Sequence, residues 1–164
     1  MKLAILKSFA RPIAIAIILI TGVSVLAAVT LTGTKVKNGA LVIPKAAITS
    51  KATFYPIVVD GVKMEVFAVL ADDGTIRTAL NTCQVCNNSG RGWYVQEGDE
   101  MVCQNCGNRF NINKIELIKN GCNPIPITKD LKTETKATIT INADVLASGE
   151  QVSGIAFQQT GEPR

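Results

Sequence analysis

Two Cys-x-x-Cys pairs constrain this chain more than any other feature of its sequence. Cys83 and Cys86 form the first pair, and Cys103 and Cys106 form the second after 16 intervening residues. A Cys-x-x-Cys pair in a tight turn lets two thiolates converge on one ion while backbone N–H groups point at the sulfurs. Two such turns on adjacent hairpins make a tetrahedral sulfur site, which suits zinc, mononuclear iron and small iron–sulfur clusters. We therefore predict a metal centre on these four cysteines.

Disulfide chemistry is the competing interpretation of the same residues. Each pair can close on itself, or one pair can act as a thiol–disulfide redox site. A redox pair usually lies at a helix N-terminus, whereas both pairs here follow strand-like runs, which favours metal. The fifth cysteine, Cys122, has three interpretations: a small buried residue, a further or exchange metal ligand, or one half of an intermolecular disulfide.

Composition narrows the chemistry and the partners. The chain has no histidine, which excludes a histidine general base, a Ser-His-Asp triad and a mixed Cys/His metal site. The net charge is +4, but Lys2, Lys7 and Arg11 precede the first apolar run, and the remaining 14 basic residues nearly balance 13 acids. No basic stripe that would neutralise phosphates remains, so we predict no nucleic-acid partner.

The N-terminal segment predicts a membrane anchor. Residues 12–34 carry no charge, and their centre, residues 13–31, has about the ~20 apolar residues that a helix needs to span a bilayer. The preceding basic residues favour a cytoplasmic N-terminus and an extracytoplasmic C-terminal domain. A signal peptide cleaved near residues 25–27 is the alternative.

Mainly β structure is predicted for the rest of the chain, with a short C-terminal helix. We expect an anchor at 1–34, a linker at 35–52, a tetracysteine metal-binding β domain at 53–150 and a tail at 151–164. Asp60-Gly61 and Gly98-Asp99 are typical of hairpin turns. The segment 122–126 is too rich in proline for a central strand. The predicted strands are 40–43, 54–59, 62–70, 75–80, 93–96, 100–102, 109–112, 115–118 and 137–141.

Several ordered motifs resemble one protein family. They are Phe54-Tyr55-Pro56, Val59-Asp60-Gly61, Asp73-Gly74-Thr75-Ile76-Arg77-Thr78-Ala79, Asn81-Thr82-Cys83-Gln84-Val85-Cys86, Gln96-Glu97-Gly98-Asp99, Val102-Cys103-Gln104-Asn105-Cys106-Gly107, Phe110 and Gly121-Cys122-Asn123-Pro124. Over residues 53–127 the chain resembles the FtrD-like membrane iron–sulfur proteins. The resemblance implies metal ligation by Cys83, Cys86, Cys103 and Cys106, and an electron-handling role beside an Ftr-type iron permease. It leaves the role of Cys122 open.

A looser similarity is to Rieske domains, in which two metal-binding loops each lie on a β-hairpin. The stretch Cys106-Gly107-Asn108-Arg109-Phe110 and the proline-rich loop at 122–126 follow that plan. Rieske loops supply two cysteines and two histidines, and this chain has no histidine. Thiolates in place of imidazoles would lower the reduction potential and remove its dependence on pH.

Three functions are compatible with these observations. The first is an electron carrier, not an enzyme, that binds an iron–sulfur cluster or mononuclear iron at the cell membrane for an iron-uptake system. Its partners would be the lipid bilayer and an Ftr-type iron permease or another membrane redox protein. The second is a structural zinc domain for protein contacts, and the third is a thiol–disulfide oxidoreductase.

Overall fold

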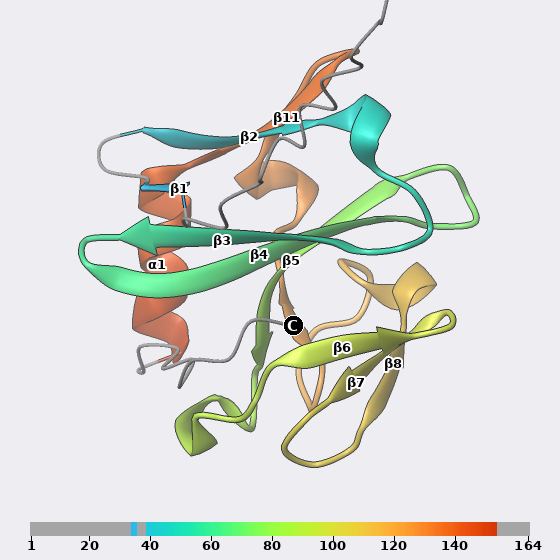
Figure 1. Cartoon of the computed structure of the whole chain (residues 1–164), viewed down its shortest axis with the longest axis vertical. Coiled ribbons are helices and arrows are strands. Elements are labelled where there is room, and N and C mark those ends of the chain that lie inside the picture. Colours follow the sequence, from blue (N-terminus) through green and yellow to red (C-terminus); the bar gives the residue numbers. More distant parts are fainter. Residues whose placement is uncertain (1–33, 36–38, 154–164) are drawn as a thin grey trace, which may run out of the picture. The chain divides into compact units, whose positions relative to one another are not determined.

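A computed structural model describes residues 34–35 and 39–153, which lie in the second of two units of the chain, Leu31–Arg164. The described residues are mainly β with a short C-terminal helix, as predicted (Figure 1). The strands are β1 (Thr34–Lys35), β2 (Ala40–Pro44), β3 (Thr53–Val59), β4 (Val62–Leu70), β5 (Ile76–Cys83), β6 (Tyr94–Glu97), β7 (Glu100–Cys103), β8 (Arg109–Asn111), β9 (Pro124–Pro126), β10 (Thr133–Glu134) and β11 (Thr138–Asn142). The helices are α1 (Ala143–Ser153) and 3-10 turns at Lys45–Ala47, Asn87–Ser89, Ile112–Lys114 and Lys129–Leu131.

No helix in the part of the chain that the structure describes is long and apolar enough to cross a membrane. The predicted transmembrane segment at 13–31 and the alternative cleavage site at 25–27 both lie outside the described residues. Residues 154–164 of the predicted tail lie outside them as well.

The largest sheet has the strand order β1-β3-β4-β5-β9, and its strand β4 contributes to two cores. The predicted alternation in β4 is confirmed, because Met64, Val66 and Ala68 pack into a first core with residues of β2, β11 and α1. Phe67 and Val69 point to the opposite face and join a second core. That second core includes Cys83, Cys86 and Cys103, so the sheet holds the cysteines on one side and the C-terminal elements on the other.

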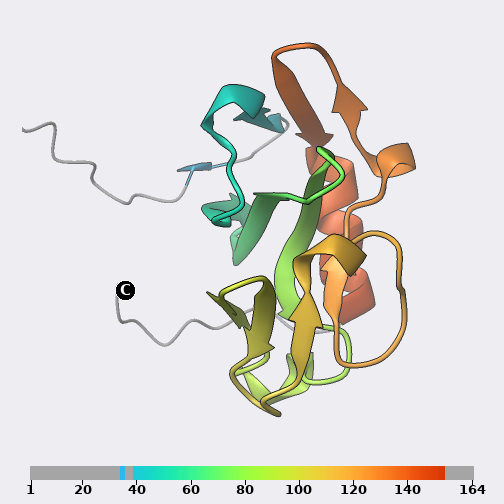
Figure 2. The same cartoon turned by 90° about the vertical axis from the view of Figure 1, so that its right-hand side faces the viewer.

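A smaller sheet, β6-β7-β8, carries the second cysteine pair. The pairing of β6 with β7 places Tyr94 opposite Cys103 at one end and Glu97 opposite Glu100 at the hairpin tip. In both views this sheet lies on the side of β5 that faces away from β2 and β11 (Figure 1, Figure 2). The cysteine end and the acidic tip are therefore opposite ends of one hairpin.

The structure departs from the sequence-based expectations in a few segments. The prediction of a strand at 115–118 is wrong. A 3-10 turn at Ile112–Lys114 precedes that segment, and the positive φ of Glu116 (68°) prevents an extended chain there. The proline-rich segment does pair, as β9, but at the end of its sheet, where missing N–H donors are tolerated. Strand β2 pairs along its length with β11, so part of the predicted linker packs with the domain.

Candidate metal centre

All five cysteines of the chain gather at the ends of three elements. Cys83 ends β5 and Cys103 ends β7, while Cys86 and Cys106 follow in the turns after these strands and Cys122 precedes β9. Within the described residues they form two groups whose sulfurs lie within 4.8 Å of one another: Cys83, Cys86 and Cys122, and Cys86, Cys103 and Cys106. All five are free thiols. The two groups share Cys86, and between them they contain the four predicted ligands and Cys122.

The two Cys-x-x-Cys turns have the same hydrogen-bond pattern. The sulfur of Cys83 accepts hydrogen bonds from the backbone N–H groups of Val85 and Cys86. The sulfur of Cys103 accepts them from the N–H groups of Asn105 and Cys106, at the same positions along the turn. Converging N–H groups stabilise negative charge on sulfur, which is the form that binds metal.

Thiolate character differs among the cysteines. Burial raises the pKa of Cys83, but hydrogen bonds from the Tyr94 hydroxyl and two backbone N–H groups outweigh it, so that the pKa is lowered. The N–H of Asn108 lowers the pKa of Cys106. Burial raises the pKa of Cys103 to about 12. Each turn therefore contributes one cysteine whose surroundings favour the thiolate, Cys83 in the first and Cys106 in the second.

The segment before β6 joins the two turns. The carbonyl of Gly92 accepts a hydrogen bond from Cys83 N at 2.7 Å, and the carbonyl of Trp93 accepts one from Gln104 N at 2.8 Å. A Cβ on Gly92 would lie 2.8 Å from the carbonyl oxygen of Cys86. This approach is too close for any residue other than glycine without a shift of the turn.

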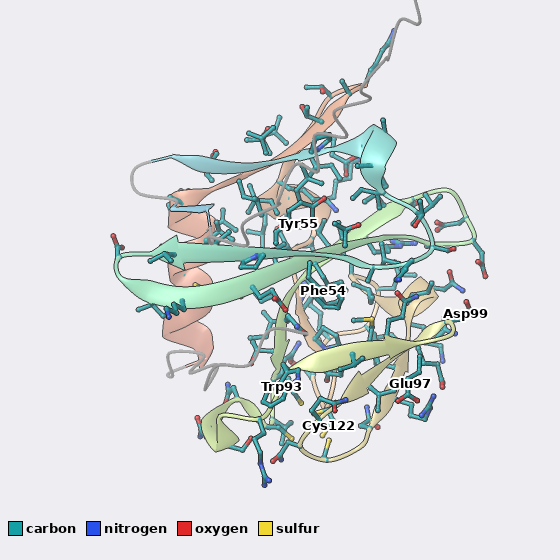
Figure 3. All side chains as sticks on the ribbon, in the orientation of Figure 1. Phe54, Tyr55, Trp93, Glu97, Asp99 and Cys122 are labelled. Atoms are coloured by element: carbon teal, nitrogen blue, oxygen red, sulfur yellow. The ribbon has the colours of Figure 1, made fainter. Side chains whose placement is uncertain are left out.

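A third loop, residues 118–123, closes over both turns. Asn123 accepts a hydrogen bond through its carbonyl from Gln84 N at 3.1 Å, in the first turn. The side-chain amide of Asn108, beside the second turn, donates to the carbonyl of Cys122 at 2.5 Å. Figure 3 shows Cys122 and Trp93 at the end of the β6-β7-β8 sheet opposite Glu97 and Asp99.

The centre runs from the core to the surface. Cys83 and Cys103 are 0% and 1% exposed, whereas Cys106 is exposed. Tyr94 and Phe110 pack in the same core. The acids of the hairpin tip, Glu97 and Glu100, form ion pairs with Arg109 at 2.9 and 2.6 Å.

Sequence patterns did not identify Gly92 and Asn108 as part of this site. Gly92 matters because of its contact with Cys86, and Asn108 because it reaches the carbonyl of Cys122, 14 residues away. Gly92 belongs to no motif that the sequence singles out, and Asn108 appears only within the stretch Cys106-Gly107-Asn108-Arg109-Phe110. The position of Asn108 two residues after Cys106 was the only signal in the sequence.

Comparisons with known proteins give a family and a distant fold likeness. A family described as membrane iron-sulfur containing protein FtrD-like matches residues 34–152, more than half of the chain. No curated protein matches the chain.

Two solved structures resemble the chain remotely. The quaternary ammonium Rieske monooxygenase CntA, in complex with an inhibitor, has 12% identity and a TM-score of 0.42, over 65% of this chain and 32% of that protein. A naphthalene 1,2-dioxygenase mutant bound to phenanthrene has 16% identity and a TM-score of 0.41, over 77% of this chain and 27% of that protein. The chain thus spans a third or less of each, and a likeness this remote carries no functional argument.

Proposed function

The chain belongs to the FtrD-like family of membrane iron–sulfur containing proteins, and from this premise we propose that its cysteine cluster binds iron and carries electrons at a membrane. Cys83, Cys86, Cys103 and Cys106 are the proposed ligands of an iron–sulfur cluster or a single iron. One observation carries the proposal: the two Cys-x-x-Cys turns lie side by side, with Cys86 of the first turn grouped with both cysteines of the second, and each turn directs N–H groups at its first sulfur.

The donors present fit such a centre. Cysteine sulfur is the usual ligand of iron–sulfur clusters, and the chain offers thiols without any histidine. The acids of the hairpin tip lie at the opposite end of the β6–β7 hairpin, so the proposed ligand set is purely sulfur. Bound iron would supply one-electron chemistry, and the chain would supply thiolates, hydrogen bonds and burial.

The exposure of the cysteines suits a carrier. Cys83 and Cys103 lie in the second core, which shields that side of the site from water. Cys106 is exposed and provides the edge through which a redox partner can exchange an electron. The proposed partners are the bilayer, reached through the N-terminal segment, and an Ftr-type iron permease or another membrane redox protein. We place the domain outside the cytoplasm.

Anaerobic purification of the full chain in mild detergent tests this proposal. We expect bound iron and a visible absorption band that changes reversibly on reduction. Cys103→Ser should abolish both signals. Val85→Ser is the matched control, because it lies in the first turn with an exposed side chain, and it should keep both. Colourless protein with stoichiometric zinc would contradict the proposal.

A structural zinc site is a second candidate, because three of the thiols are part of a core that metal binding would stabilise. In that case the bound metal is redox-silent and the surface serves for protein contacts.

A thiol–disulfide oxidoreductase is a third candidate function, because Cys106 is exposed and its pKa is lowered by the N–H of Asn108. Rapid disulfide exchange that one Cys→Ser substitution abolishes would favour it over both metal sites.

A further inference from the structure

We propose that Cys122 is a fifth thiolate ligand and that the five cysteines hold two metal ions, with the sulfur of Cys86 shared between them. This inference deepens the proposed metal centre and rests on it. The first position is formed by Cys83, Cys86 and Cys122, and the second by Cys86, Cys103 and Cys106.

The geometry of the sulfurs favours two positions over one. Around one tetrahedral ion with bonds of ~2.3 Å, neighbouring sulfurs lie roughly 3.8 Å apart, and there is room for four. Here the sulfurs fall into two groups of three within 4.8 Å, and only Cys86 belongs to both. Cys83 belongs only to the group that also contains Cys122. Without Cys122, the first position would have two thiols.

The backbone around Cys122 is held in place from both sides. Its own carbonyl accepts the amide of Asn108, next to the second turn, and the carbonyl of Asn123 accepts the N–H of Gln84, inside the first turn. The Asn123 side chain is 2% exposed, and its amide donates to the carbonyl of Ile118 at 3.0 Å, which closes the loop on itself. These contacts fix the backbone from which the Cys122 thiol reaches Cys83 and Cys86.

Packing accounts for only part of this placement, since Cys122 packs against the second core from its edge. Cys122 is only half-buried, and the atoms within 4.8 Å of its sulfur include the thiols of Cys83 and Cys86. Asn120 and Gly121 before it both have positive φ values, 74° and 106°, which is an unusual backbone for two successive residues. This backbone fixes the place of Cys122 beside the other thiols.

The chemistry of binding follows from the donor set. Each thiol that binds loses its proton to water, and the sulfur of Cys86 uses two lone pairs to bridge. Each ion then has three protein sulfurs and one position for a non-protein ligand. Divalent ions that accept tetrahedral sulfur, such as Co²⁺, suit both positions.

A Co²⁺ titration of the reduced full chain, without oxygen and in mild detergent, tests the stoichiometry. We expect two Co²⁺ per chain with tetrahedral thiolate absorption, and magnetic coupling between the ions through the shared sulfur. Cys122→Ser should bind one ion on the remaining four cysteines and lose the coupling. Ile118→Ser, an exposed position in the same loop, is the control and should bind two.

Alkylation of the wild-type chain gives a readout that needs no variant. With Co²⁺ bound, mass spectrometry of the peptides should show at least tenfold slower alkylation of Cys122 than in the metal-free chain. One ion per wild-type chain, or a Cys122 alkylation rate that Co²⁺ leaves unchanged, overturns the inference. Either result leaves the iron-dependent electron transfer test untouched, and redox-silent iron would in turn leave the Co²⁺ stoichiometry untouched.

Discussion

Tyr94 is the side chain that links the core to the charge on the centre. It is 0% exposed, and its hydroxyl lies beside the Cys83 sulfur, where it lowers the pKa of that thiol. Burial, and then the neighbouring Cys83, raise the pKa of Tyr94, so the hydroxyl stays protonated and serves as a hydrogen-bond donor toward the sulfur. A donor of this kind stabilises the more negative, reduced form of a thiolate-bound centre.

Removal of this hydroxyl should therefore lower the reduction potential. Loss of a hydrogen-bond donor to a charged sulfur is worth about 1.5 kcal/mol, which for one electron corresponds to a decrease of roughly 65 mV. Potentiometry of iron-loaded Tyr94→Phe measures it. Phe110→Leu changes packing in the same core without removing a hydrogen bond and should leave the potential nearly unchanged. An unaltered potential in Tyr94→Phe would contradict this role.

Gly92 should tolerate no side chain. A Cβ there would lie 2.8 and 2.9 Å from the carbonyl oxygen and carbon of Cys86, which are backbone atoms and cannot rotate away. Gly92→Ala should destabilise the domain by about 1–3 kcal/mol and weaken metal binding. Urea unfolding at equal metal content measures the first effect. Asn88→Ala, exposed in the same turn, should change stability by less than about 0.5 kcal/mol.

Among the elements, a buried ion pair anchors the segment after β8 to β5. Lys132 and Glu116 have side chains 1% and 7% exposed, and Nζ lies 2.6 Å from Oε1. The same carboxylate oxygen accepts the N–H of Thr78 at 2.6 Å and its hydroxyl at 3.0 Å. Glu116 thus ties the chain just before the Cys122 loop to the strand that ends at Cys83.

Removing one partner should cost more than removing both charges. Lys132→Met leaves the Glu116 carboxylate buried without its cation and should destabilise the domain by about 3–5 kcal/mol. Adding Glu116→Gln keeps an acceptor for Thr78, so the double variant should regain part of the loss. Chemical denaturation of the three proteins compares them. A double variant less stable than Lys132→Met would show that the charge on Glu116 is not the cause.

The turn between β4 and β5 makes a pH-dependent contribution to the stability of the folded domain. A hydrogen bond from the backbone N–H of Thr75 lowers the pKa of Asp73 from 3.8, and Arg77 adds to the effect. Because the pKa is lower in the folded state, this contribution is complete above pH 3.8 and disappears as the pH falls through the folded value. Asp73→Asn should therefore be less stable than wild type near neutrality, with a difference that shrinks at low pH. A difference that stays constant on acidification would contradict this.

At the scale of the whole molecule, three of the cysteines are part of a hydrophobic core. Cys83, Cys86 and Cys103 pack with Phe67 and Val69, on the face of the largest sheet opposite the first core. Metal bound at these sulfurs would therefore bind the folded state and stabilise it.

Metal removal should lower the melting temperature by at least about 10 °C, since metal at 1,000 times its Kd contributes ~4 kcal/mol and each 1 kcal/mol shifts a domain this size by roughly 4–8 °C. Scanning calorimetry before and after chelation measures the change. Cys103→Ser is the control, because a chain with a broken site should respond little to the chelator. An equal melting temperature with and without metal would show that metal binding does not stabilise the folded state.

Much of the fold could be predicted from short sequence patterns. The hairpin with Asp60-Gly61 and the alternation along β4 are confirmed, because turn geometry and side-chain direction depend on a few neighbouring residues. The family was identified from ordered motifs and is confirmed by the match over 34–152. The segment 115–118 was predicted wrongly, because the side chain of Glu116 bonds to Thr78, 38 residues earlier.

The site divides in the same way. The spacing within each Cys-x-x-Cys pair predicted two sulfur-directed turns, since the N–H groups that face each first sulfur lie two and three residues further along. Contacts across the fold place Cys122 beside Cys83 and Cys86, and set Gly92 against the first turn. Local patterns were enough where the interacting atoms are a few bonds apart, and the tertiary structure was needed where they come from separate strands and loops.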